Sequence, residues 1–247
     1  MRIQKYCIWY TLVAAGIYFV GLYMVHLFPA TDPGWSSAHL AQQYQDHTLR
    51  IKIGALITAL SGGFFIPFIC TICVQLYRHE KLDDPDSPPL WSLMAAIGGT
   101  LMVVIIAMPP TFFGVAAFAA DRSPDVTAAL HQCGVFFWLT GDWAYIFLCI
   151  GMAVVCLKPH AVPHSPFTRW LGYCVILSIL GTEPSVLPFI FHTGPLSWNG
   201  VIGYWLPVIP AFLIFTIPAV IAFMRALNGQ IGVAQVKSSV PPEPVSV

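Results

Sequence analysis

Charged residues are what this sequence has least of. Only 9% of its 247 residues are Asp, Glu, Lys or Arg, and 57% are hydrophobic, whereas soluble domains carry about 25% charge. A soluble surface needs polar cover that this composition cannot supply. The 11 acidic and 11 basic residues give a formal net charge of zero, so no basic field exists to bind nucleic acid. The composition therefore predicts an all-α, polytopic membrane protein whose first partner is the lipid bilayer.

Familiar catalytic and cofactor-binding patterns are also absent. The sequence contains no G-x-S-x-G, Walker A, G-x-G-x-x-G or H-E-x-x-H motif. Its seven cysteines lie inside apolar stretches, and their odd number argues against a secreted disulfide framework. Nothing in these patterns favours an enzyme.

Six apolar stretches are long enough to cross a bilayer, which takes about 20 residues of α-helix. The first follows two basic residues, as a signal peptide would, but it is too long and lacks a suitable cleavage site, so we interpret it as a retained span. The sequence thus predicts a bundle of six transmembrane helices in one domain, residues 1–227. The expected spans cover residues 7–28, 51–77, 90–118, 128–156, 170–192 and 200–226.

The distribution of Lys and Arg predicts an orientation for this bundle. Of the 11 basic residues, Arg50, Lys52 and Arg122 fall on one side, and the other eight fall on the side of the two termini. This excess predicts that both termini are cytoplasmic and that the connection before the second span faces outward.

Two segments outside the spans have patterns of their own. Ser36 or Ser37 can cap a helix, and sparse apolar residues through 36–50 predict a helix on the outer membrane surface. The tail, residues 228–247, ends in VPPEPVSV and shows no apolar periodicity. Such a composition predicts a disordered cytoplasmic segment.

A weak internal repeat suggests three related hairpins. Each outward-going span opens with a tryptophan and is followed, past its outer end, by a proline that introduces the return helix. These residues are Trp9, Trp91 and Trp170, and Pro33, Pro124 and Pro195. Duplication of a hairpin explains this pattern, and so does the general preference of Trp for membrane interfaces and of Pro for helix starts.

Two acidic side chains lie deep in the apolar stretches. Asp142 lies about 20 Å along the helix from either end of its span, and Glu183 lies just past the centre of the next span. No Lys or Arg lies deep in any span, and a charge at the bilayer centre costs roughly 2.5–3.5 kcal/mol. We therefore expect both acids to face an enclosed polar chamber inside the bundle, and at rest to be protonated or to share one proton between them.

Neighbouring residues extend this candidate site. At about 100° per residue, Trp138, Asp142 and Tyr145 fall on one stripe of the fourth span. In the fifth span Thr182 adjoins Glu183 within a G-T-E-P sequence, where proline removes a backbone hydrogen bond. Interrupted helices around midplane acids are typical of transporter sites. These five residues are the candidate proton- and ligand-binding site.

Glycine and proline interrupt three other spans at similar depth. Ser61-Gly62-Gly63 lies in the second span, Pro109-Pro110 in the third, and Pro207 and Pro210 in the sixth. Loosened backbone at membrane depth is tolerated only inside protein or beside water. The plainer interpretation is that both residue types are common in membrane helices.

Three histidines form a second constellation. His26 ends the first span, His131 opens the fourth and His192 ends the fifth, so the topology places all three at the outer interface. Three imidazoles at one level can hold zinc or copper, or ligate haem, although no H-x-x-x-H spacing is present. The alternative is that they are ordinary interfacial side chains and that the protein carries no cofactor.

Two short motifs give a resemblance. TDPGW at 31–35 and GPLSWNGVIGYWLP at 194–207 resemble motifs of a group of bacterial inner-membrane proteins of about this size, with six spans and no known activity. The resemblance implies a bacterial cytoplasmic membrane. It implies no catalytic or binding residues.

The leading hypothesis is a carrier or channel-like protein for a small apolar or weakly polar molecule, with Asp142 and Glu183 taking up and releasing a proton. One alternative is a metal- or haem-binding redox subunit that uses the outer histidines. Another is a non-catalytic accessory subunit whose polar helix faces bind a partner protein or a second copy of the chain.

Overall fold

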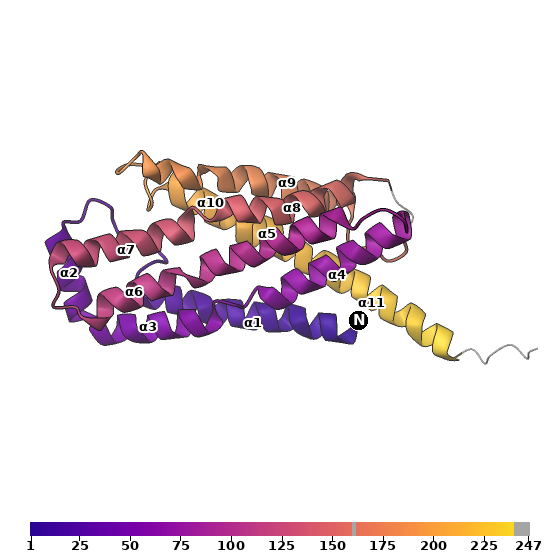
Figure 1. Ribbon diagram of the computed structural model, residues 1–247, viewed down its shortest axis with the longest axis horizontal. Helices are drawn as coiled ribbons and strands as arrows, with labels where there is room; N and C mark the ends of the chain where they lie inside the picture. Colours follow the sequence, from indigo (N-terminus) through magenta and orange to yellow (C-terminus); the bar gives the residue numbers. More distant parts are fainter. Residues whose placement is uncertain (160–161, 240–247) are drawn as a thin grey trace, which may run out of the picture.

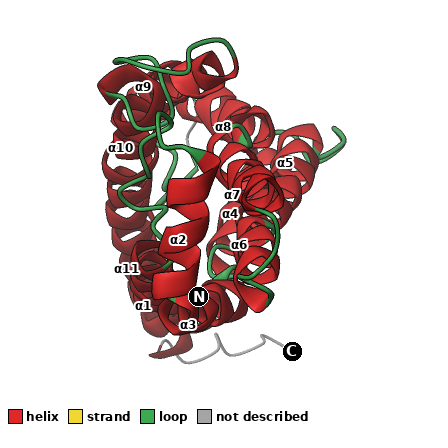
Figure 2. Cartoon of the chain, turned by 90° about the vertical axis from the view of Figure 1, so that its left-hand side faces the viewer, coloured by secondary structure: helices red, strands yellow, loops and turns green. Residues whose placement is uncertain are grey.

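The computed structural model describes residues 1–159 and 162–239, and at Asp142, Ala234 and 236–239 it describes the backbone alone. Every regular element in this part is helical, and six helical spans are long and apolar enough to cross a membrane. The predicted six-helix bundle is therefore confirmed. The spans run along the long axis of the molecule, and a short helix lies across one end (Figures 1 and 2).

Within the described residues, the first span, α1 (Arg2–Met24), is the single span without a break. Each of the other five consists of two or more helical segments. These are α3 (Thr48–Ser61) with α4 (Ile66–Asp83); α5 (Leu90–Ala107) with α6 (Pro109–Phe118); α7 (Pro124–Leu139) with α8 (Asp142–Leu157); α9 (Arg169–Thr182) with the 3₁₀ helix η1 (Glu183–Phe189); and η2 (Val201–Trp205), α10 (Leu206–Ile209), η3 (Pro210–Thr216) and α11 (Ile217–Ser239).

The breaks follow from local sequence. Gly62-Gly63 separates α3 from α4, and Pro109 starts a new helix directly after the end of α5. In the sixth span, prolines precede a π-helical stretch, because a proline cannot donate the hydrogen bond that an α-helix requires of it. The interruptions expected at these positions are present, and the fourth span adds one at Thr140-Gly141 that the sequence analysis did not anticipate.

The two ends of the bundle differ in what they carry. The start of α1 and the end of α11 lie at one end, which we call the terminal side (Figure 1). The helix α2 (Ser37–Asp46) lies across the opposite end, the α2 side (Figure 2). The Ser36 side chain accepts a hydrogen bond from the backbone N–H of His39 at 3.2 Å and so caps α2.

The C-terminal tail is more ordered than its composition suggested. The helix α11 continues to Ser239, so the expectation of disorder from residue 228 is wrong as far as 239. The reason is a polar anchor: the Gln230 amide donates to Gln75 Oε1 at 3.1 Å and to the His164 carbonyl at 2.8 Å. The segment that carries VPPEPVSV, residues 240–247, lies outside the described residues.

Small residues bring α1 and α3 into close contact. A Cβ atom at Gly21 would collide with Thr58 Oγ1, and one at Gly54 would lie 2.6 Å from Met24 Cβ. Small residues at such crossings let helix backbones approach closely, which favours packing inside a bilayer. The unbroken first span is therefore tightly held by α3, the first half of the second span.

Candidate functional site

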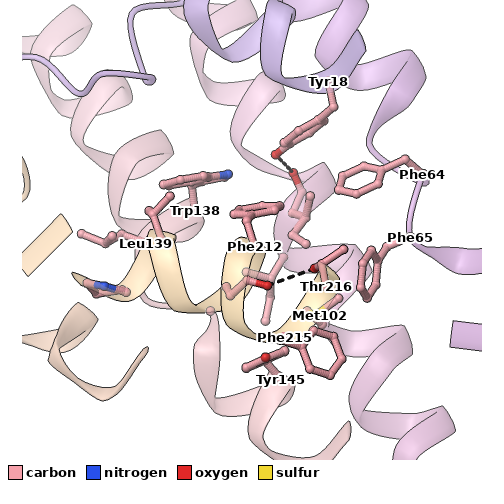
Figure 3. Close-up of a pocket in the computed structure, with 16 residues that line it drawn as sticks. Tyr18, Phe64, Phe65, Met102, Trp138, Leu139, Tyr145, Phe212, Phe215 and Thr216 are labelled. Carbon is pink, nitrogen blue, oxygen red and sulfur yellow. Dashed lines mark hydrogen bonds between the residues drawn. The ribbon is translucent and has the colours of Figure 1, made fainter. Parts of the chain in front are cut away.

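A cavity of about 90 Å³ lies in the middle of the bundle. Its wall is almost entirely aromatic and aliphatic, with rings contributed by several spans (Figure 3). Among them are Tyr18 of α1, Phe64 and Phe65 between α3 and α4, and Trp138 of α7. Apolar cavities of this kind stay dry and can bind small apolar molecules or xenon.

The helix breaks surround this cavity. Residues beside four breaks line it, including Phe64 in the second span, Ile106 in the third, Gly141 in the fourth and Pro207 in the sixth. The fifth span packs against the sixth without lining the cavity: a Cβ atom at Gly181 would meet the ring of Pro210, and neither residue is part of the cavity wall. Four interrupted spans therefore converge on one small space, together with the unbroken α1.

The hydroxyl groups in the cavity wall are already hydrogen-bonded. Tyr18 Oη donates to the Ile106 carbonyl at 2.9 Å, and Thr216 Oγ1 donates to the Ala211 carbonyl at 3.0 Å (Figure 3). Tyr145 Oη lies 2.6 Å from Ser178 Oγ. Both acceptor carbonyls lie at breaks or in π-helical turns, where the helical ladder leaves them free. The wall thus satisfies its own polar groups and presents mainly apolar surface.

The structure brings together two of the five predicted ligand-binding residues. Trp138 and Tyr145 both line the cavity, from α7 and α8. Thr182 is buried, but its hydroxyl donates to the Ile179 carbonyl of its own helix at 2.9 Å, and it is not part of the cavity wall.

Glu183 is placed differently from the expectation. Its side chain is exposed on the outside of the bundle, whereas its neighbours Thr182 and Ser185 are buried. Thr182 ends α9 and Glu183 begins η1, and successive residues of a helix point about 100° apart; here Thr182 faces the interior and Glu183 faces away from it. The expectation that Glu183 shares an interior chamber with a second acid is therefore wrong.

Asp142 begins α8, directly after the cavity-lining Gly141. Its side chain lies outside the described part of the chain, so the prediction that it holds a proton in the interior stays a prediction.

Polar residues close the α2 side of the bundle. His131 is buried, with Nε2 2.8 Å from Thr31 Oγ1 and Nδ1 2.9 Å from Tyr44 Oη. A neutral imidazole has one donor and one acceptor nitrogen, so one hydroxyl donates to the ring and the other accepts from it. Trp198 Nε1 donates to the Thr31 carbonyl at 2.9 Å, and Tyr204 Oη donates to the Leu27 carbonyl.

We call these five side chains, Thr31, Tyr44, His131, Trp198 and Tyr204, the polar cap. It joins the segment after α1 to α2, to α7 and to the start of the sixth span. Three of its members, Thr31, Trp198 and Tyr204, belong to the TDPGW and GPLSWNGVIGYWLP segments, so interpreting those motifs as structural contacts would have indicated part of the cap. Sequence alone gave no indication that His131 bridges two hydroxyls, because its partners lie 100 and 87 residues away.

The three histidines do not form a metal site. His131 is occupied by its two hydroxyl partners, and His192 is exposed in the loop after η1. His26 lies near His47, with ring centroids 5.8 Å apart. No group of three His, Cys, Asp or Glu side chains suited to a metal occurs among the residues that the structure describes. The prediction that His26, His131 and His192 together ligate zinc, copper or haem is therefore not supported by their placement.

Two titratable groups outside the spans are shifted by their surroundings. Burial lowers the pKa of His26 from its ordinary value, and the positive charge of Arg50 and the imidazole of His47 lower it further. Burial raises the pKa of Tyr44. Both side chains are therefore uncharged at neutral pH, which suits their position in and beside the polar cap, where water is excluded.

Aromatic packing closes the terminal side. Phe68, Phe167 and Phe223 are fully buried, and the Phe223 ring lies 5.7 Å from Phe68 and 5.6 Å from Phe167. Farther out, the carboxylate of Glu80 accepts from the backbone N–H groups of Trp91 at 2.8 Å and Ser92 at 3.0 Å, which caps α5. The cavity is therefore shut off from both ends of the bundle.

No family model matches the chain, and no curated protein or solved structure matches it.

Proposed function

We propose that this protein is a membrane-embedded carrier that holds a small apolar or weakly polar molecule in the central cavity. The observation that carries the proposal is the convergence of four interrupted spans on one apolar space. A bundle that only had to be stable would fill such a space, because each unfilled methyl-sized volume costs stability. Interrupted spans are also where membrane carriers bind and move.

The proton role is assigned to Asp142 alone. Its backbone position, next to Gly141 in the cavity wall and at the start of α8, would let its protonation change the polarity beside a bound molecule. Glu183 has no such position, because its side chain is exposed. The asymmetry of Lys and Arg supports cytoplasmic termini, and the resemblance of the TDPGW and GPLSWNGVIGYWLP motifs supports a bacterial inner-membrane location.

Xenon binding tests the site itself. Purified protein in lipid nanodiscs is expected to give a bound-xenon NMR signal separate from the signals of xenon in lipid and water. Ala211→Leu fills part of the cavity and should remove that signal. The matched control Ala59→Leu adds the same atoms at an exposed position of α3 and should leave the signal intact. A parent protein without a bound signal would contradict the proposal.

Competition then tests the proton role. Benzyl alcohol, a weakly polar probe, should displace xenon with an affinity that depends on pH in the parent protein and not in Asp142→Asn. If the parent shows the same affinity at every pH, Asp142 has no proton role and the binding site stands without it.

A further inference from the structure

A second, larger hollow lies on the outside of the bundle, beside the central cavity. It has a volume of about 600 Å³ and follows α7 from Ala129 to the break at Thr140-Gly141. Ile105 of α5 and Phe189 of η1 form its two sides. We call this hollow the lateral groove. Phe137, Trp143 and Phe189 on its rim are each more than two-fifths exposed, so it opens toward the lipid of the bilayer.

The broken fourth span shapes the groove. Thr140 Oγ1 donates to the Phe136 carbonyl at 2.7 Å, and α7 ends at Leu139. Gly141 follows without a side chain, and a Cβ atom there would collide with Ile105 Cγ2. Only glycine leaves room for Ile105 to lie against the break.

Ile105 and Gly141 belong to both spaces, because both residues line the groove and both line the central cavity. The Ile105 side chain, seated on Gly141, is therefore the wall that the two spaces share. Both ends of the bundle are closed by the polar cap and by aromatic packing. A sideways route from the cavity into the groove therefore leads past the branched side chain of Ile105.

The lining of the groove indicates its occupant. None of the described residues that line it is charged, so a phosphate or carboxylate headgroup would find no counter-ion there. One amide is present: Gln132 is exposed within the span, about 12 Å along the helix from Pro124. It makes no hydrogen bond within the described part of the chain. An exposed amide at this depth matches a hydroxyl, carbonyl or ester group, and the aromatic floor beyond it matches a hydrocarbon chain.

We infer that the lateral groove binds a neutral, single-chain amphiphile from the bilayer. Its polar end lies at Gln132, its chain lies along Phe136 and Thr140, and Ile105 against Gly141 is the door through which apolar groups pass to the central cavity. The door rests on the proposed function of that cavity, whereas binding in the groove does not.

Photolabelling tests the occupant. The probe is hexadecanol with a diazirine at the chain end, in nanodiscs. Labelling of the peptides around Ile105 and Trp143 should saturate, and unlabelled hexadecanol should compete about fivefold better than hexadecane, as one hydrogen bond in a bilayer allows. Gln132→Leu should abolish this preference. The control Thr100→Val, which removes an exposed polar group elsewhere on α5, should keep it.

Two results would overturn groove binding. One is labelling that rises linearly with probe concentration, as ordinary lipid contact does. The other is an unlabelled groove whose residues cross-link to a second copy of the chain, which would make this face a subunit interface.

Xenon exchange tests the door. Ile105→Ala, and more mildly Ile105→Val, should speed the exchange of xenon between the cavity and its surroundings by several-fold. Ile97→Ala, a lipid-facing change on the same helix, should not. A bound-xenon signal whose exchange is equally fast in all three variants and the parent disproves the door but leaves the cavity site standing. Loss of the signal in the parent disproves the proposed function and leaves the groove to be judged by labelling.

Discussion

The two ends of this bundle are closed in different ways. The α2 side is closed by the polar cap, in which single hydrogen bonds join residues 87 to 177 positions apart. The terminal side is closed by phenylalanine rings that pack edge to face, without hydrogen bonds between them. Directional contacts fix one arrangement and fail when one partner is lost, whereas packed rings lose stability in proportion to the volume removed. The difference teaches that opening either end would break specific hydrogen bonds or expose buried rings. A passage through the side of the bundle, at the lateral groove, requires neither.

The largest effect should come from the ring packing. Phe223→Ala removes a fully buried ring and should cost about 3–5 kcal/mol, as such truncations do in well-packed cores. The apparent Tm in detergent measures this loss. Phe118→Ala, at a side chain that is 76% exposed, is the matched control and should change Tm little. Equal losses in the two variants would show that the terminal side is not closed by packing.

A smaller loss is expected at the polar cap. His131→Leu leaves the Thr31 and Tyr44 hydroxyls without their shared partner, and the expected cost is about 2–3 kcal/mol, because each unsatisfied buried group costs about 1–3 and hydroxyls can partly reorient. Tyr44→Phe removes one of the two contacts and should cost less than half as much. If the double variant loses the sum of the two single losses, the residues do not act together and the cap is not a network.

The smallest effect should be the pH dependence that His26 contributes. Because its pKa is lowered in the folded protein, the unfolded chain binds a proton there first, and stability falls as the pH drops below the ordinary value of about 6.5. His26 has a φ of 60°, which asparagine tolerates. His26→Asn should therefore keep the fold while flattening the loss of Tm between pH 7 and pH 5. An unchanged slope would assign the acid sensitivity to other groups.

Much of the fold was predictable from sequence, and the direction of individual side chains was not. Apolar runs define six spans whatever their neighbours are, and Gly62-Gly63 and the prolines mark breaks by their local chemistry. The break at Thr140-Gly141 escaped notice because its glycine is explained only by Ile105, which lies 36 residues away along the chain. The stripe drawn through Trp138 and Tyr145 assumed one continuous helix, yet both residues still reach the cavity.

In the candidate site, too, the depth of a residue was predictable from sequence and the direction of its side chain was not. A search for charge at depth found Glu183, but depth alone does not say which way a residue points, and the structure turns it outward. The cavity is defined by ring contacts between spans, such as Tyr18 with Phe64 at 5.0 Å. Such contacts have no signature in one sequence. The polar cap likewise depends on hydrogen bonds between distant segments. Only two of those segments, 31–35 and 194–207, stand out as motifs in the sequence.

The unbroken α1 has a mechanical consequence. Every other described span is interrupted, and four of these interruptions lie beside the cavity. The two halves of the protein can therefore shift relative to each other by bending at these breaks. The first span has no such joint and is pressed against its neighbour at Gly21 and Gly54. The helix α1 therefore moves as one rigid body. A relative movement of the two halves must tilt the whole of α1 or rotate around it.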